Sequence, residues 1–370
     1  MSNNHWLTFE GTHFKIGYQL GKYWISRIQS LSDEPHGTEF LEKYTYIKWL
    51  NDPWNKEHEP LLGYFLEHFP DLVEELSGMV QGINDYGGKI RTTFPTLFGL
   101  LLGEVDEEVF GCSTIAYRSG KETLLVHNEE DEKFRFPLCF ARVRIKSDQG
   151  NKEFLSVSHP FQLFGSSAGA TPSFAFTGNS IKMDKQRKAR IRGSLRCRVP
   201  KTVLSRLMLE QDGIPAVKRL LGAHHSALPN HWFVVDTKNI WSVQLLPLAF
   251  GYLSPKSQMA WVRVKEAIAF HTNHFQGLAQ SYTTWSCNKA YQKESEKRLK
   301  KLISLQALEQ DFSSAGLRNV LLSLRNSSKY LEKTTAATIL FRVQPKGVLG
   351  DADNYFNGTI DVIGPYSIRS

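Results

Sequence analysis

Apolar residues in the first third of the chain recur with the spacing of amphipathic helices. Segment 11–31 has apolar positions every three to four residues, and this pattern predicts one helix face made of Phe14, Tyr18, Ile25 and Ile28. Segment 70–85 repeats the pattern from Leu72 to Ile83. We therefore predict that the first third of the chain is mainly helical.

From residue 112 onward, the pattern changes to short β-rich segments separated by turn residues. Two hairpins are predicted, over 112–130 around Ser-Gly-Lys and over 139–159 around Asp-Gln-Gly-Asn. The remaining predicted elements are a strand in 172–181, helices in 200–223, strands in 231–247 and 267–273, helices in 289–322, and closing strands in 336–343 and 358–364. This order favours an α+β fold in which helices cover antiparallel sheets, because a parallel α/β fold alternates its elements.

Composition places the chain among ordinary globular proteins. It has 370 residues, of which 41% are hydrophobic and 22% are charged. The longest apolar run, 94–102, is too short to cross a bilayer, and the N-terminus has neither the basic start nor the apolar stretch of a signal peptide. We therefore expect a cytoplasmic protein with no membrane partner.

The net charge of +8 has a local origin. Segment 181–201, which we call the basic block, carries nine Lys or Arg residues and one Asp, a difference that equals the excess of the whole chain. Aromatic residues are absent from the block, so we expect no nucleic-acid partner; the block is either a solvated loop or a surface for an anionic ligand.

Cysteines are few and widely spaced, at positions 112, 139, 197 and 287. Their spacing fits neither a disulfide framework nor a metal site. Cys112 has the most suggestive neighbours: Gly111 precedes it, which permits close approach to the peptide bond, and Ser113 and Thr114 follow it. The predicted hairpin returns the polar end of segment 124–133 to the same sheet edge. Cys112 is therefore a candidate nucleophile.

Several motifs together resemble a known family. In chain order they are GTHFKIGYQLGK, EELSGMVQGI, GCSTIAY with LLVHNEE, FAFTGNSI, RVPKTVLSRLMLE, SALPNHWFVVD, FHTNHF and SEKRLKKLI. With these motifs the chain resembles the family of isopenicillin N acyltransferase (acyl-CoA:6-aminopenicillanic acid acyltransferase), which is one of the N-terminal-nucleophile hydrolases. The resemblance covers almost the whole length.

This resemblance implies a four-layer αββα sandwich with a helical N-terminal prosegment. It also implies self-cleavage between Gly111 and Cys112, which gives a prosegment or small subunit 1–111 that stays bound to a catalytic region 112–370. The new N-terminal amine would then be the base for the Cys112 thiol, since its ordinary pKa of about 7.7–8.0 suits neutral pH. The implied activity is hydrolysis or acyl transfer on a linear amide, or on an acyl-CoA-like substrate, without a cofactor.

Further roles follow from the resemblance at matching positions. Glu130 occupies the acidic position after Asn128, where the family usually has aspartate, and Asp131 is a rival for that role. Asn230 resembles the family's asparagine that donates to the oxyanion. Asn179 resembles a second asparagine of the pocket, and Arg298 resembles an arginine at the side of the pocket. Side-chain amides suit this task because they are fixed neutral donors to an oxygen that gains charge in the transition state.

Two other functions remain open at the level of sequence. An uncleaved, non-catalytic protein of the same fold would hold an anionic ligand through the basic block; the Glu130 departure and segment 345–358, read as an insertion, favour it slightly. A thiol hydrolase that does not cleave itself would pair Cys112 with His127, although strand alternation turns one of His127 and Asn128 away from the thiol. The histidine pairs 224/225 and 271/274 lack nearby Cys or Glu at zinc spacing, so we expect no metal.

Overall fold

The computed structural model describes residues 6–32, 59–88, 90–103, 111–130, 138–148, 150–181, 198–226, 229–245, 259–274, 289–327, 335–354 and 361–369. The described helices are α1 (His13–Ser32), α4 (Glu59–His68), α5 (Pro70–Tyr86), α6 (Phe94–Gly103), α8 (Lys201–Met208), α9 (Ile214–Ala223), α11 (Lys289–Glu309) and α12 (Ser314–Asn326). The described strands are β1 (Leu7–Gly11), β2 (Cys112–Ser119), β3 (Glu122–Glu130), β4 (Cys139–Ile145), β5 (Lys152–Ser158), β6 (Ala168–Ala170), β7 (Ala175–Ser180), β8 (Arg198–Val199), β9 (His225–Ser226), β10 (Asn230–Val235), β11 (Ile240–Leu245), β12 (Met259–Arg263), β13 (Ile268–His271), β14 (Thr335–Gln344), β15 (Gly347–Asn354) and β16 (Asp361–Arg369).

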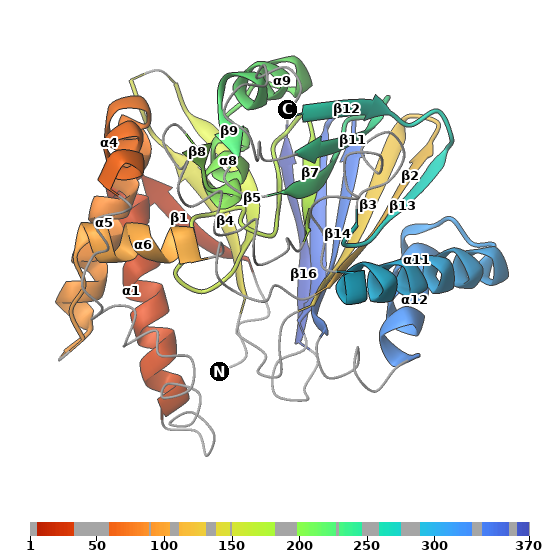
Figure 1. The fold of residues 1–370 in the computed structure, drawn as a ribbon, viewed down its shortest axis with the longest axis horizontal. Helices are drawn as coiled ribbons and strands as arrows, with labels where there is room; N and C mark the ends of the chain where they lie inside the picture. Colours follow the sequence, from red (N-terminus) through yellow and green to blue (C-terminus); the bar gives the residue numbers. More distant parts are fainter. Residues whose placement is uncertain are drawn as a thin grey trace.

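Two large sheets form the centre of the molecule (Figure 1). One has eight strands in the order β1-β4-β5-β6-β7-β10-β11-β12, and the other has six in the order β13-β2-β3-β14-β15-β16. Neighbouring strands in both sheets run antiparallel except β1, which pairs with β4 in parallel. The prediction of a mixed fold with mainly antiparallel sheets is confirmed, while β1 was not predicted.

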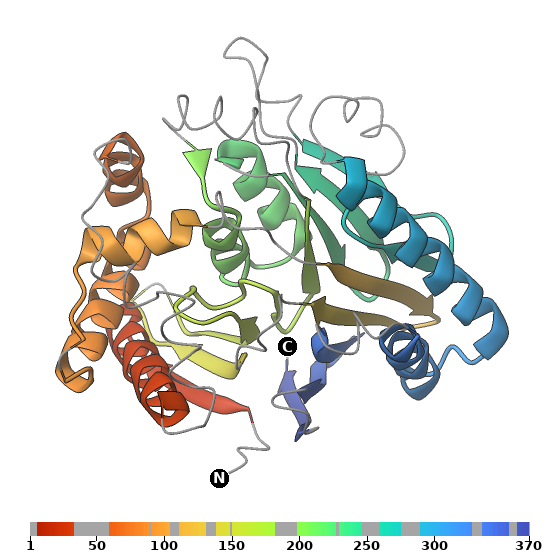
Figure 2. The same cartoon turned by 60° about the horizontal axis from the view of Figure 1, so that its bottom comes forward.

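Three apolar clusters show how these elements pack. The first joins α1, α5, α6, α8 and α9 to one face of the eight-stranded sheet. The second contains side chains from both sheets, such as Phe140 and Phe341, and therefore lies between them. The third joins α11 and α12 to the other face of the six-stranded sheet. In Figures 1 and 2 the helices of the first cluster and those of the third lie on opposite sides of the sheets.

Helices α1 and α5 touch along their backbones. A Cβ atom added to Gly17 or Gly21 of α1 would lie 1.8 Å from the Glu75 carbonyl oxygen or 2.2 Å from that of Met79. The matching glycines of α5, Gly78 and Gly82, lie equally close to α1. These glycines allow a separation that side chains would prevent.

The predicted face of α1 needs correction. Phe14 is 38% exposed, and the buried side of the helix is instead formed by His13, Ile16, Gly17, Leu20, Gly21, Trp24 and Ile25. The helix is turned because its glycines, rather than its aromatic residues, face α5. The α5 prediction is confirmed, since Leu72, Leu76, Met79 and Ile83 are all buried.

Most strand predictions agree with the structure. Both predicted hairpins form, as β2–β3 and β4–β5. The described part of segment 345–358, interpreted from the sequence as an insertion, forms strand β15 (Gly347–Asn354), paired with β14 and β16. None of the described helices combines the length and the apolar character needed to cross a membrane.

Candidate active site

Cys112 is the first residue of β2 and lies opposite Glu129 of β3. A two-residue turn joins Ser119 to Glu122 and fixes this register. Alternation along the strands then places Cys112 and Thr114, with their partners Glu129 and His127, on the face toward the eight-stranded sheet. The site therefore lies at one end of the space between the two sheets, where polar side chains replace the apolar core.

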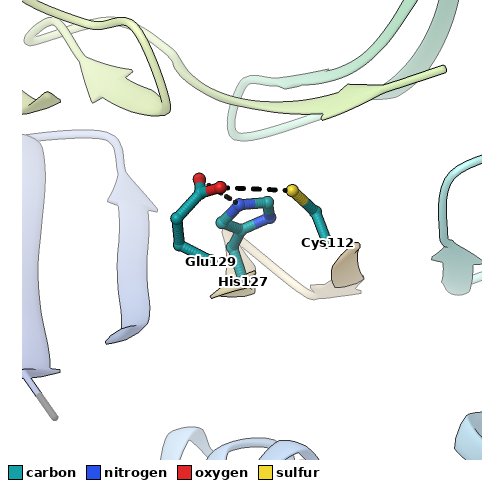
Figure 3. Close-up of side chains that lie close together, drawn as sticks. All are labelled: Cys112, His127 and Glu129. Atoms are coloured by element: carbon teal, nitrogen blue, oxygen red, sulfur yellow. Dashed lines mark hydrogen bonds and ion pairs between the residues drawn. The ribbon is translucent and has the colours of Figure 1, made fainter. Parts of the chain in front are cut away.

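The Cys112 thiol is buried and donates to the carboxylate of Glu129, with 3.3 Å between Sγ and Oε1. His127 contacts the other oxygen, with Nε2 at 3.2 Å from Oε2, and Figure 3 shows the carboxylate joining the two groups. Ser167 also donates to Glu129, and His159 Nε2 lies 3.5 Å from its Oε1. Glu129 is therefore surrounded by donors.

These surroundings shift the pKa values of acid and thiol in opposite directions. Burial opposes ionisation of Glu129, but His159 and His127 outweigh it and hold the pKa of this carboxyl well below its usual range. Burial, followed by the negative charges of Glu129 and Glu130, raises the pKa of the Cys112 thiol well above its ordinary value, while Lys201 opposes this rise. The thiol is therefore neutral in the intact chain.

From the sequence, Glu130 is expected to lie beside the Cys112 thiol, but its side chain lies on the opposite face of β3. Its Oε1 accepts from the Ser113 hydroxyl at 3.3 Å, and its Oε2 pairs with Arg298 Nη1 at 2.9 Å. Burial raises the pKa of Glu130, and Arg298 counteracts this. Glu129 contacts the thiol instead, because the two-residue turn places it directly opposite Cys112. Asp131 lies outside the described residues.

Glu130 and Arg298 instead surround the peptide bond that precedes Cys112. A Cβ atom on Gly111 would lie 2.3 Å from Glu130 Oε2 and 2.5 Å from the Arg298 guanidinium carbon. Arg298, from α11, is 6% exposed and its Nη1 donates to the Cys112 carbonyl at 3.2 Å. A residue with a side chain does not fit at position 111 unless this ion pair moves.

Asn273, which sequence reasoning did not single out, holds the nitrogen of Cys112. Its Oδ1 accepts from the Cys112 backbone N–H at 2.6 Å and from Arg298 Nη2 at 2.7 Å. Its Nδ2 donates to the Ser180 carbonyl at 2.8 Å, and its backbone N–H donates to Ser295 Oγ at 2.6 Å. Both sides of the Cys112 main chain are thus fixed by buried polar groups.

Asn179 of β7 reaches the row of side chains that contains the thiol. Its Oδ1 accepts from the Thr114 hydroxyl at 3.0 Å, and Thr114 is next to Cys112 on the same strand face. Its Nδ2 has no hydrogen-bond partner among the described residues, although the side chain is fully buried. A buried amide donor left free in this place is suited to an oxyanion.

Asn230 makes different contacts. With its amide oriented to satisfy its neighbours, its nitrogen donates to the Asn179 carbonyl and its oxygen accepts from Trp232 Nε1, both at 3.0 Å. None of its described hydrogen bonds reaches Cys112. Of the two predicted asparagines, Asn179 thus has the donor group available, while Asn230 supports the strand that carries it.

His127 lies on the same side of β3 as the thiol, and Asn128 turns away to donate to the Leu321 carbonyl of α12. The Cys112 sulfur, a His127 ring nitrogen and a Glu129 oxygen all lie within 4.8 Å of one another, which makes them one possible metal-binding group. His13, Asp71 and Glu210 form a second such group, but Arg206 already pairs with Glu210 at 2.7 Å.

The histidine pairs noted in the sequence serve other contacts. His224 Nδ1 is 3.1 Å from the Tyr64 hydroxyl, and the His271 ring stacks on His231 with centroids 3.3 Å apart. Burial holds the pKa of His271 well below its usual range, so this stack is uncharged. Most of the basic block, 182–197, lies outside the described residues, while Lys201 at its end is buried and donates to Ser180.

Comparisons with known proteins find likenesses among solved structures. No protein-family model and no curated protein matches the chain. Among solved structures, the chain is similar to the Caenorhabditis elegans ortholog of N-acylethanolamine-hydrolyzing acid amidase, with 10% sequence identity and a TM-score of 0.44 over 62% of this chain and 92% of that chain. A likeness this distant transfers neither fold family nor activity, so function has to be argued from the side chains of this chain.

Proposed function

We propose that the chain is a thiol amide hydrolase of the N-terminal-nucleophile type, which cuts itself between Gly111 and Cys112 and then uses Cys112 on linear amides. The observation that supports this most is the set of contacts around one residue. The Cys112 thiol faces a carboxylate, its nitrogen is held by Asn273, and Arg298 and Glu130 flank the preceding peptide bond.

Self-cleavage needs the sulfur to reach the Gly111 carbonyl carbon. As the C–S bond forms and the C–N bond breaks, Glu129 takes the thiol proton, and this proton is then returned to the Cys112 nitrogen, which leaves as an amine. Water then opens the thioester, which returns the thiol and leaves a carboxylate on Gly111. Fixing both neighbours of the bond lowers the entropic part of the barrier.

Turnover uses the amine that cleavage creates. Asn273 Oδ1 already accepts from this nitrogen, so the amine is oriented as soon as it forms. Its ordinary pKa of about 7.7–8.0 lets it remove the thiol proton at neutral pH. The Asn179 amide is the proposed oxyanion donor. Water as acceptor gives hydrolysis, and an amine acceptor gives acyl transfer.

The wider fold is consistent with this proposal. The three apolar clusters follow the order helix, sheet, sheet, helix, which supports the four-layer αββα arrangement. Strand β1 pairs with β4, and Glu75 of α5 pairs with Arg206 of α8, so contacts cross the proposed cut. We therefore expect fragment 1–111 to stay bound. The proposed substrates are small-molecule amides or acyl-CoA-like compounds.

Intact-mass spectrometry of purified protein that has been treated with a chelator tests the proposal. Two fragments, 1–111 and 112–370, are expected from the natural chain, and a single chain is expected from Cys112→Ala. The processed protein is then screened with amide substrates for release of an amine. A natural chain that stays in one piece and releases no amine would contradict both steps.

A second candidate is a thiol hydrolase that stays uncleaved. It is favoured by His127, which lies on the same side as the thiol and within 4.8 Å of both partners. In this mechanism Glu129, held in place by His127, accepts the thiol proton. Amidase activity in a chain that remains intact, and its loss in His127→Gln, would support this candidate over the first.

A further inference from the structure

The Cys112 site also has the features of a metal-binding site. Its sulfur, imidazole and carboxylate are the ligand types that zinc prefers. They come from neighbouring strands whose register is fixed, and Figure 3 shows hydrogen bonds from the Glu129 carboxylate to both other side chains. The carboxylate contacts each partner with a different oxygen, Sγ to Oε1 at 3.3 Å and Nε2 to Oε2 at 3.2 Å, and the three residues each offer a ligand atom within 4.8 Å of the other two.

The orientation of His127 is already set for this role. Thr114 donates its only hydroxyl hydrogen to Asn179 Oδ1 at 3.0 Å, so it accepts from His127 Nδ1 at 2.8 Å. His127 Nε2 is then the nitrogen that faces Glu129. Metal-bound histidines are usually held in this way, with the second ring nitrogen donating to an acceptor.

We infer that this site binds a thiophilic divalent cation such as Zn²⁺, through Cys112 Sγ, His127 Nε2 and the Glu129 carboxylate. The cation takes the place of the thiol hydrogen and of the hydrogen between His127 and Glu129. Two protons leave the site and one divalent cation enters it. The total charge of the site is therefore unchanged, and no uncompensated charge is buried. Neither Cys139 nor the stacked His231 and His271 offers such a set of ligands among the described residues.

His159 marks the side from which the cation enters. Its side chain is 26% exposed and its Nε2 is 3.5 Å from Glu129 Oε1, whereas Cys112 and His127 are buried. A fourth ligand, either this imidazole or a water molecule, completes a tetrahedral site on that side.

The consequence for activity rests on the proposed function. A sulfur bound to Zn²⁺ is not free to attack the Gly111 carbonyl, so the cation holds the chain in its uncleaved form. Removing the cation with a chelator starts self-cleavage. The metal is thus an inhibitor of this thiol and takes no part in amide hydrolysis.

Cobalt titration of the metal-free protein tests metal binding apart from cleavage. Natural protein and the Cys139→Ser control are expected to develop a thiolate-to-Co²⁺ charge-transfer band and tetrahedral visible bands, both removed by added Zn²⁺. Cys112→Ser and His127→Gln are expected to lose the charge-transfer band, with circular dichroism confirming that they fold. A missing band in the natural protein, or a band that persists in Cys112→Ser, overturns the inference.

The two proposals fail in different ways. If the cobalt bands form but chelated protein never cleaves, metal binding stands and self-cleavage fails. If chelated protein cleaves while no cobalt band forms in it, the function stands and the metal site fails. Mass spectrometry with and without a chelator, run beside the titration, separates these results.

Discussion

At the residue scale, the adjacent acids Glu129 and Glu130 have opposite surroundings. The pKa of Glu129 lies well below its usual value because His159 and His127 outweigh the effect of its burial. The pKa of Glu130 is raised, mainly by burial, although Arg298 opposes the rise. One acid therefore contacts the thiol, and the other lies beside the peptide bond that precedes it.

Replacing Glu129 with Gln should separate thiol reactivity from self-cleavage. The substitution removes a negative charge beside the thiol, so the thiol pKa falls and alkylation by iodoacetamide extends to lower pH. Cleavage loses its proton acceptor and should slow by about 10²-fold or more. Alkylation followed against pH and a mass-spectrometric time course measure the two effects. An unchanged cleavage rate would exclude Glu129 as the acceptor.

Replacing Asn179 and Asn230 with Ala, one at a time, should show which amide stabilises the oxyanion. Asn179→Ala removes the free buried donor, so kcat of the processed enzyme should fall by about 10²–10³-fold. Asn230→Ala leaves that donor in place, and a much smaller loss in kcat is expected. Steady-state kinetics on one amide substrate compares the variants. A larger loss in kcat for Asn230→Ala than for Asn179→Ala would instead support Asn230 as the oxyanion donor.

The sequence contains enough information to predict which acid faces Cys112. It does not predict which residues from distant segments join the site. A Gly-Lys turn of two residues pairs Cys112 with Glu129, whereas alignment to the Asn-x-acid motif selects Glu130. Asn273 and His159 come from segments far away in the sequence, and no local pattern places them beside residue 112. Their positions depend on how the two sheets pack.

At the element scale, local signals explain which strands were predicted. The β2–β3 and β4–β5 hairpins have alternating apolar residues and strong turn residues, so the sequence defines them. Strand β6 is only Ala168–Ala170 and carries no such signal. Strand β15, with glycines and acids, becomes a strand because β14 and β16 pair with it. Long-range pairing therefore supplies what the local sequence lacks.

The contact between α1 and α5 gives a prediction about stability. Gly17→Ala inserts a methyl group where the Glu75 backbone already lies, and overpacking of this kind costs about 1–3 kcal/mol. Gly63→Ala in α4 is the matched control, because a Cβ atom there meets nothing within 4 Å and helix propensity improves by about 0.5–1 kcal/mol. Thermal unfolding should shift the melting temperature down for Gly17→Ala and up for Gly63→Ala. A neutral Gly17→Ala would mean that the helices are separated more widely.

At the scale of the whole molecule, one buried charge network joins the two sides of the proposed cut. Arg206 of α8 is fully buried and pairs with Glu75 of α5 at 2.7 Å and with Glu210 at 2.7 Å. His13 of α1 contacts Glu210 at 3.0 Å. The network fixes the helices before residue 112 against the sheet that follows it, so its protonation affects the stability of the entire fold.

Acid should therefore destabilise the protein through Glu210. Burial opposes its ionisation, but Arg206 and His13 outweigh this and lower its pKa from 4.5 to about 2. A carboxyl with a lowered folded pKa contributes stability that is complete above its unfolded value and is lost as pH falls from about 4.5 toward 2. The contribution is on the order of 3 kcal/mol, since each pKa unit corresponds to about 1.4 kcal/mol.

Urea unfolding at several pH values, compared between the natural chain and Glu210→Gln, checks this expectation. The variant should be less stable at pH 6, and its free energy of unfolding should fall less steeply between pH 5 and 3, because the group that binds the extra proton is gone. Asp212→Asn, which alters an ion pair whose aspartate is 85% exposed, should change stability by less than about 1 kcal/mol. Parallel pH profiles for the natural chain and Glu210→Gln would show that other groups control acid unfolding, because only loss of the titrating carboxyl changes the slope.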